Sequence, residues 1–225
     1  DSPSQGSANI GTLVHDIAHE LGDDVDEPTL VAEVERRWGR LGLPPGWMTD
    51  RQLEEARKMV RRLAAYYQQA QATQWSKVGS ELPVRVDVGR ATIVGRVDRL
   101  ERDSDGRLRV LDYKTGSATV SKAKLGQHPQ LATYQVATEH GAFRDEGSTS
   151  AGAALLQLGK AALKTVAPQV QPPLAESDDP GWAERLVTDT AEGMGGAEFV
   201  AVVGDWCTFC PVRSSCPAQA EGDTI

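Results

Sequence analysis

No run of eighteen or more apolar residues occurs in this chain of 225 residues, so we expect no membrane-spanning helix. The first residues, DSPSQGSANIGTLVH, contain no methionine, no basic segment and no apolar stretch of the kind found in secretory signal peptides. We therefore expect that they are not a signal peptide. A beginning of this kind indicates a piece excised from a longer protein.

Cysteine is scarce, because the chain has only three. They form the pattern Cys207-x2-Cys210-x5-Cys216, and an odd number in one tight cluster favours a metal or cluster site over a secreted disulfide framework. Four thiolates complete a zinc site or a [4Fe–4S] cluster, so this chain is one short. Two alternatives are a loop of reduced cysteines and a zinc knuckle with His128 or His140, which the spacing does not support.

Basic residues are outnumbered, with 24 Lys and Arg against 32 Asp and Glu, and the formal net charge is −8. This excess of acidic residues argues against a protein that binds nucleic acid through an overall positive electrostatic field. DNA is not excluded, because a metal ion can neutralise a local acidic site. The sequence also lacks a GxxxxGK[ST] loop, so any ATP hydrolysis must reside elsewhere.

Hydrophobic spacing indicates a helical first third followed by a mixed region. Helices are predicted over 10–21, from Pro28 onward and over 51–75, the last capped by Thr49 or Asp50. Alternation predicts an antiparallel meander of strands over 82–88, 91–101 and 107–114, with a turn at 103–106. Further segments are a helix at 128–140, one or two strands in 153–170, a helix in 179–194 and an extended piece at 198–206.

This order predicts one mixed α/β domain. Residues 1–76 would form its helical part, 77–204 its core and 205–225 a cysteine appendage.

The stretch VLDYKTG, residues 110–116, carries the most chemistry. Side chains alternate along a strand, so Asp112 and Lys114 should share a face, and the predicted hairpin brings Asp98 close to Asp112. Two facing carboxylates repel unless a cation lies between them, and Mg²⁺ prefers such oxygen ligands. Lys114 can orient or deprotonate the attacking water, or stabilise charge on a phosphate. The simpler alternative is a surface ion pair.

GRVDR, VLDYKTG about a dozen residues later, and then QLATY resemble the PD-(D/E)XK nuclease superfamily in their order and spacing. More narrowly, the chain resembles RecB-type nuclease domains of bacterial helicase–nucleases of the RecBCD, AddAB and AdnAB kind, from GTLVH at 11–15 to the cysteines. The resemblance implies a restriction-endonuclease-like core with an N-terminal helical region. It also implies a metal-dependent DNA exonuclease that uses Mg²⁺ or Mn²⁺.

The resemblance assigns roles to individual residues. The implied metal ligands are His15, Asp98, Asp112 and the backbone carbonyl of Tyr113, and Lys114 matches the catalytic lysine. Gln130 and Tyr134 of QLATY would brace the site or contact DNA, and Glu81 matches an acid of some members. Val97 stands where the superfamily's name has proline, as is common in RecB-type members.

The resemblance also implies a context. AddB-like, AdnAB-like and Cas4-like nucleases carry the same cysteine pattern and a fourth cysteine upstream, so we expect a structural [4Fe–4S] cluster in the parent protein, incomplete in this piece. Implied partners are DNA, as a single strand or an unwound duplex end, helicase motor domains in the same parent chain, and a second subunit. The implied role is double-strand-break end processing and recombinational repair in the bacterial cytoplasm, at the nucleoid.

Two other functions stay open. One is a non-cleaving DNA-binding or scaffold domain, whose hallmark would be loss of Asp98, Asp112 or Lys114, and all three are present. The other is a stand-alone Cas4-like nuclease, against which the long helical insert at 28–75 and the missing fourth cysteine argue.

Overall fold

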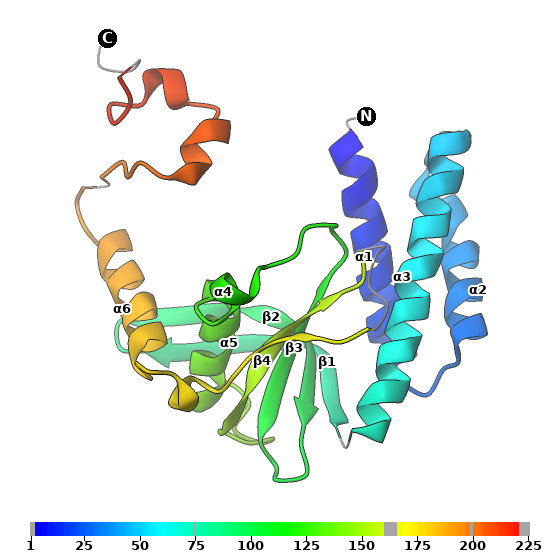
Figure 1. Ribbon diagram of the computed structural model, residues 1–225, viewed down its shortest axis with the longest axis horizontal. Helices are drawn as coiled ribbons and strands as arrows, with labels where there is room; N and C mark the ends of the chain where they lie inside the picture. Colours follow the sequence, from blue (N-terminus) through cyan, green and yellow to red (C-terminus); the bar gives the residue numbers. More distant parts are fainter. Residues whose placement is uncertain (1–2, 74, 160–165, 199, 221–225) are drawn as a thin grey trace.

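Three long helices stand beside a five-stranded sheet (Figure 1). The computed structural model describes residues 3–73, 75–159, 166–198 and 200–220. The helices are α1 (Pro3–Leu21), α2 (Glu27–Trp38), α3 (Trp47–Ala72), α4 (Lys122–Leu125), α5 (Pro129–Glu139) and α6 (Trp182–Met194), and η1–η4 are 3₁₀ turns at Gly39–Leu41, Leu174–Glu176, Asp205–Phe209 and Arg213–Ser215. The strands are β1 (Ser76–Val88), β2 (Ala91–Arg102), β3 (Leu108–Lys114), β4 (Ser150–Gln157) and β5 (Gln169–Gln171).

The sheet is mixed, in the order β1-β2-β3-β4-β5. The first three strands form the expected antiparallel meander, while β4 runs parallel to β3 and antiparallel to β5. A parallel neighbour requires a crossover, and α4 and α5 lie in the chain between β3 and β4. This arrangement confirms the predicted α/β fold class. No helix in the described ranges is both long and apolar enough to cross a lipid bilayer.

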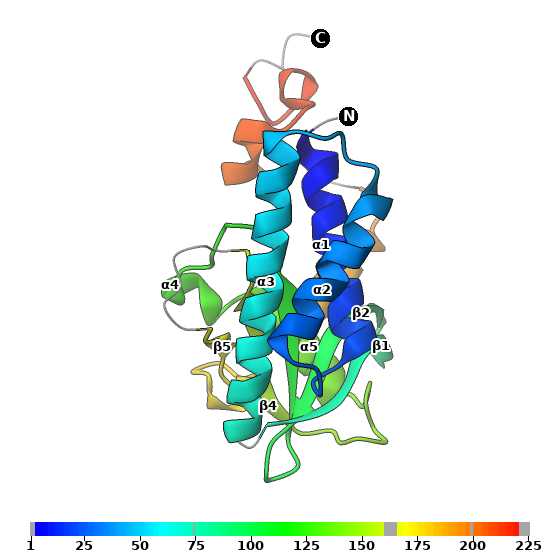
Figure 2. The same ribbon diagram turned by 90° about the vertical axis from the view of Figure 1, so that its right-hand side faces the viewer.

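Alternating side chains of β3 pack on both faces of the sheet. Leu111 and Tyr113 join the core formed with α1, α2 and α3, whereas Val110 joins a second core with Leu131 of α5. Figures 1 and 2 show the three long helices on one side of the sheet and α5 on the other. Strand β3 is therefore buried on both faces, which explains its nearly continuous apolar sequence before Asp112.

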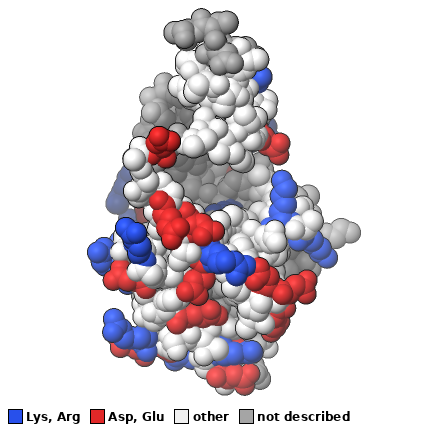
Figure 3. Space-filling view, turned by 90° about the vertical axis from the view of Figure 1, so that its left-hand side faces the viewer, with Lys and Arg blue, Asp and Glu red and all other residues white. Residues whose placement is uncertain are grey.

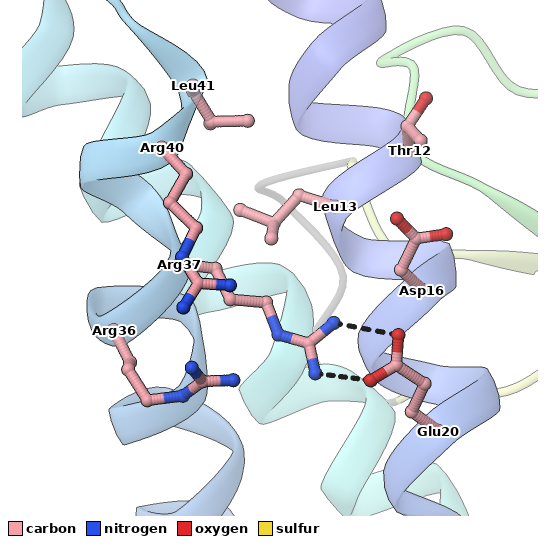
Figure 4. Close-up of a pocket in the computed structure, with 8 residues that line it drawn as sticks. All are labelled: Thr12, Leu13, Asp16, Glu20, Arg36, Arg37, Arg40 and Leu41. Carbon is pink, nitrogen blue, oxygen red and sulfur yellow. Dashed lines mark hydrogen bonds and ion pairs between the residues drawn. The ribbon is translucent and has the colours of Figure 1, made fainter.

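Charged side chains join the long helices to one another. Asp26 caps α2 by accepting a hydrogen bond from the Thr29 amide at 2.9 Å. Arg37 of α2 donates to both carboxylate oxygens of Glu20 of α1, at 3.1 and 2.6 Å (Figure 4). This bidentate pair fixes the C-terminal half of α1 against α2.

Some predicted boundaries were wrong. The long helix begins at Trp47, so Thr49 and Asp50 lie inside its first turns and do not cap it. Gly46 occupies the N-cap position with a φ of 153°, a backbone conformation that glycine adopts readily and other residues rarely adopt. Strand β1 begins at Ser76 rather than 82, because its first residues lack an apolar alternation that sequence reading detects. In the described part of 198–206 no strand forms, and Asp205 begins η3.

A buried charge network joins the helices to the sheet. Arg99 and Glu101 of β2 are 1% and 0% exposed. Arg99 donates to both carboxylate oxygens of Asp23 at 2.5 Å and to Glu101 at 2.7 Å. Glu101 also accepts from Tyr66 of α3 at 2.6 Å and from Arg109 of β3 at 2.7 Å. Each buried charge therefore has a partner, and the network ties the α1–α2 loop, α3 and two strands together.

We expect Glu101→Gln to lower the free energy of unfolding by about 3–5 kcal/mol, because Arg99 and Arg109 would each lose a buried anionic partner. Urea denaturation measures this change. The matched control is Glu146→Gln, which removes an exposed carboxylate that pairs with Arg102, and its effect should stay below about 1 kcal/mol. Equal effects of the two substitutions would contradict the role of the network.

Candidate nuclease site

The site begins where the β1–β2 ladder places two acidic residues opposite each other. Ser80 pairs with Arg99 and Leu82 pairs with Val97, so Glu81 and Asp98 lie opposite each other between these pairs. Glu81 has a φ of 54°, the one positive φ among the non-glycine residues described. This left-handed conformation is unfavourable for a glutamate, and strain of this kind concentrates at functional sites.

Helix α1 brings a histidine to these two acids. His15 Nδ1 lies 3.2 Å from Asp98 Oδ1, and the imidazole ring meets the Tyr113 ring edge-on at 5.8 Å. One ligand atom each from His15, Glu81 and Asp98 lie within 4.8 Å of one another. The structure thus gathers three of the sequence-predicted residues, from a helix and two strands, into one group.

The second carboxylate oxygen of Asp98 is fixed by the neighbouring strand. Asp98 Oδ2 accepts a hydrogen bond from the Tyr113 amide at 2.6 Å. The last paired residues of β2 and β3 are Arg99 and Leu111, so Asp98 and Asp112 are the next residue on each strand. The hairpin therefore brings the two aspartates together across the ladder as the sequence predicts.

Asp112, Lys114, Gln130 and Tyr134 form the other half of the site. Lys114 Nζ lies 2.8 Å from Asp112 Oδ2 and donates to Gln130 Oε1 at 3.0 Å. Gln130 Nε2 in turn donates to Asp112 Oδ1 at 2.7 Å and lies 3.0 Å from the Tyr134 hydroxyl. One amide side chain therefore holds both the carboxylate and the ammonium, and Gln130 and Tyr134 are neighbours on one face of α5.

Electrostatics in the site reflect an excess of negative charge. Burial lowers the pKa of His15, but the hydrogen bond and charge of Asp98 outweigh it, and the net pKa is raised above 6.5. Burial raises the pKa of Asp112, and the charge of Asp98 adds to that effect while Lys114 opposes it. Burial likewise raises the pKa of Tyr134 to about 12, so its hydroxyl stays protonated. The raised pKa of His15, to which Asp98, Glu81 and Asp112 all contribute, indicates a place that favours positive charge.

These residues fit a divalent metal ion. Glu81 and Asp98 offer the oxygen ligands that Mg²⁺ and Mn²⁺ prefer, and His15 adds a nitrogen ligand. Asp112 Oδ2 is buried without a hydrogen bond and has the Lys114 ammonium as its ionic neighbour. Asp112 lies outside the three-residue group, because its oxygens face Lys114 and Gln130. Its role as a ligand, and that of the Tyr113 carbonyl, stay predictions.

The three cysteines lie on the short turns that follow α6, which Figure 1 places away from the sheet. Cys207, Cys210 and Cys216 are partly exposed free thiols, and the Gly204 amide donates to Cys207 Sγ at 3.4 Å. The two histidines considered as zinc ligands have other partners: His128 caps α5 and His140 lies 3.6 Å from Glu184.

The chain matches the family model of the PD-(D/E)XK nuclease superfamily over residues 1–217. It therefore belongs to that superfamily, whose members are generally metal-dependent nucleases, and the expectation from GRVDR and VLDYKTG is confirmed at this level. No curated protein sequence matches the chain. The RecB-type subgroup stays a prediction.

Sequence reasoning missed two features of the site. The strain at Glu81 has no sequence signal, because nothing in SELPV predicts a positive φ at a glutamate. The hydrogen bonds of Gln130 to both Asp112 and Lys114 depend on how α5 docks on the sheet. The order of QLATY led to the expectation that Gln130 and Tyr134, one helical turn apart, brace the site or contact DNA, but it did not reveal which side chains Gln130 would bond.

We expect Glu81→Gly to stabilise the fold by about 1 kcal/mol and to weaken Mn²⁺ binding, because glycine relieves the left-handed strain while the carboxylate is lost. Glu81→Ala is the control, since it removes the same carboxylate but keeps the strain. Thermal unfolding and calorimetric Mn²⁺ titration measure the two effects. Equal stability of the two variants would refute the strain, and unchanged Mn²⁺ affinity would remove Glu81 from the site.

Gln130→Ala should reduce the cleavage rate about 10–100-fold, because Asp112 and Lys114 would lose the side chain that orients them. Single-turnover cleavage assays measure this rate. The exposed neighbour Gln127 provides the control, and Gln127→Ala should leave the rate unchanged. A Gln130→Ala variant as active as the Gln127→Ala variant would show that the bracing is dispensable.

Proposed function

We propose that the chain is a divalent-metal-dependent deoxyribonuclease that hydrolyses phosphodiester bonds from a DNA end. The proposal rests on two groups of side chains that lie next to each other on adjacent strands. His15, Glu81 and Asp98 form a ligand group, and Lys114 is held beside it by Asp112. A ligand group next to a fixed cation is the combination that phosphodiester hydrolysis requires.

His15, Glu81 and Asp98 would hold the metal, with Asp112 alongside. A bound Mg²⁺ or Mn²⁺ supplies a water of lowered pKa and a positive charge for the scissile phosphate. The Tyr113 amide keeps the Asp98 carboxylate in one orientation. Lys114, positioned by Asp112, orients the attacking water or stabilises the negative charge that develops on the phosphate.

We further propose that this nuclease is the exonuclease module of a bacterial ATP-dependent helicase–nuclease that processes double-strand breaks for recombinational repair. The RecB-type order of the motifs and the C-x2-C-x5-C pattern support this context. ATP hydrolysis would take place in the motor domains, because the present sequence contains no GxxxxGK[ST] loop. Motor domains of the parent chain, and a second subunit, would deliver DNA to the acidic domain. This role places the protein in the cytoplasm.

Cys207, Cys210 and Cys216 would bind a [4Fe–4S] cluster whose fourth thiolate comes from outside the present sequence. The support is their spacing and their position together on two adjoining turns. Such a cluster would be structural.

A non-cleaving scaffold is the second candidate, because the net charge is −8 and the face in Figure 3 mixes acidic and basic side chains. The presence of Asp98, Asp112 and Lys114, together at the site, argues against it. A stand-alone Cas4-like nuclease is disfavoured by the long helical region and the missing fourth cysteine.

The purified chain should digest linear single-stranded DNA with Mg²⁺ or Mn²⁺ and leave circular single-stranded DNA intact, since an exonuclease needs an end. Asp112→Ala and Lys114→Ala should each lower the rate at least about 100-fold, because both groups act at the reacting phosphate. Gel analysis of labelled strands measures cleavage.

The matched controls are Asp105→Ala, on the exposed β2–β3 turn, and Lys122→Ala, on α4, and both should keep wild-type activity. Digestion of the circular strand would show that the enzyme is an endonuclease and not an exonuclease. A wild-type chain that binds Mn²⁺ and DNA but cleaves neither substrate would favour the scaffold.

A further inference from the structure

An apolar pocket of about 330 Å³ lies beside the site, between α1, the first turns of α3 and the loop after β3. Ile10 and Gly11 of α1 line it, with Trp47 and Met48 of α3 and Thr115. Figures 1 and 2 show the N-terminal halves of α1 and α3 side by side. Because Thr115 directly follows Lys114, the pocket adjoins the proposed catalytic centre.

Large apolar side chains are exposed at this pocket. Trp47 is 72% exposed and Met48 is 55% exposed, although neither is at a chain end. Tryptophan usually buries most of its surface, and exposed apolar side chains grouped at a pocket mark a binding site. Nothing in the proposed mechanism uses either residue, which leaves both side chains available to bind a ligand.

The rim of the pocket carries a free positive charge. Arg51 lines the pocket one helical turn after Trp47. Within the part of the chain that the structure describes, no carboxylate pairs with Arg51, whereas the nearby Glu55 is paired with Lys58 at 2.9 Å. An exposed aromatic ring next to an unpaired arginine is the combination that binds single-stranded nucleic acid, by stacking on a base and attracting a phosphate.

Helix α1 can lie close to the loop after Lys114 because residue 11 is a glycine. A Cβ at Gly11 would lie 2.9 Å from Thr115 Oγ1, which is closer than side chains tolerate. The missing side chain lets the helix lie against Thr115, so the wall of the pocket and the loop after Lys114 are in direct contact. The pocket therefore lies next to the loop that follows the proposed catalytic lysine.

We propose that this pocket binds an unpaired nucleobase of the DNA strand being cut, stacked on Trp47, with Arg51 at a neighbouring phosphate. The inference rests on the proposed nuclease function and deepens it, because it names the residues that would hold the single strand beside the catalytic centre. A base inside a duplex is stacked on its neighbours and cannot present its face to the indole. The pocket therefore selects a strand that has already been unwound.

The test is fluorescence anisotropy with labelled oligo(dT) and with a labelled blunt duplex, without added metal so that neither is cut. Trp47→Ala should weaken oligo(dT) binding about 5- to 150-fold, which corresponds to ~1–3 kcal/mol for one stacked base. Trp47→Phe keeps a ring and should restore most of the affinity. Duplex binding should stay unchanged in both variants.

Trp206→Ala is the matched control, because Trp206 is also exposed, at 67%, but lies on the cysteine turns. It should bind oligo(dT) as the wild type does. Arg51→Ala should reduce the slope of log affinity against log salt by about 0.7, the value for one phosphate contact on a single strand. Circular dichroism should show all variants folded, since Trp47 and Arg51 are exposed.

The inference is overturned if Trp47→Ala binds oligo(dT) as the wild type does. It is also overturned if the same variant weakens duplex binding equally, which would assign the pocket to DNA ends in general. Unchanged DNA binding with an altered oligomeric state would assign the pocket to a protein partner. If the wild type cleaves DNA in any of these cases, the proposed nuclease function stands. A wild type that neither binds nor cleaves DNA would refute both.

Discussion

The carboxylate of Asp98 is the group on which the site depends. One of its oxygens lies against His15 of α1 and the other accepts the Tyr113 amide of β3, while Glu81 of β1 lies opposite it. A helix and three strands therefore meet at a single side chain. Because negative charges so close together repel, the arrangement is stable only with positive charge nearby, and this requirement links the fold to a metal-dependent chemistry.

Buried ion pairs next to the site hold the strand segment around Asp98 in position. Arg99, the residue after Asp98, is held by Asp23 in the loop after α1 and by Glu101 on its own strand. Helix α1 carries His15 and ends two residues before Asp23, so the ion pair anchors the C-terminal end of α1 to the sheet. On the opposite face, Gln130 of α5 performs a similar task for Asp112 and Lys114. Each half of the site is thus oriented by a different helix.

The sequence predicted the fold class, since period-2 and period-3.6 patterns reveal strands and helices. It also predicted that Asp98 and Asp112 lie close together, because the DSDG turn sets the hairpin between their strands. The roles of the site residues stay predictions. The sequence did not predict that β4 pairs in parallel with β3, that β1 begins at Ser76, or that α3 begins at Trp47. These features depend on tertiary packing and on the backbone conformation at Gly46 and Glu81. The ligand group of His15, Glu81 and Asp98, with Asp112 turned toward Lys114, likewise follows from side-chain contacts that spacing does not encode.

Calorimetric titration of Mn²⁺ into the wild type and into Asp98→Asn tests the central claim most directly. Asparagine keeps the shape of the side chain but removes the charge shared by His15 and Glu81. We expect saturable Mn²⁺ binding to the wild type and a loss of affinity of at least about tenfold in the folded variant. Equal Mn²⁺ affinity of the two proteins would contradict a metal site at Asp98.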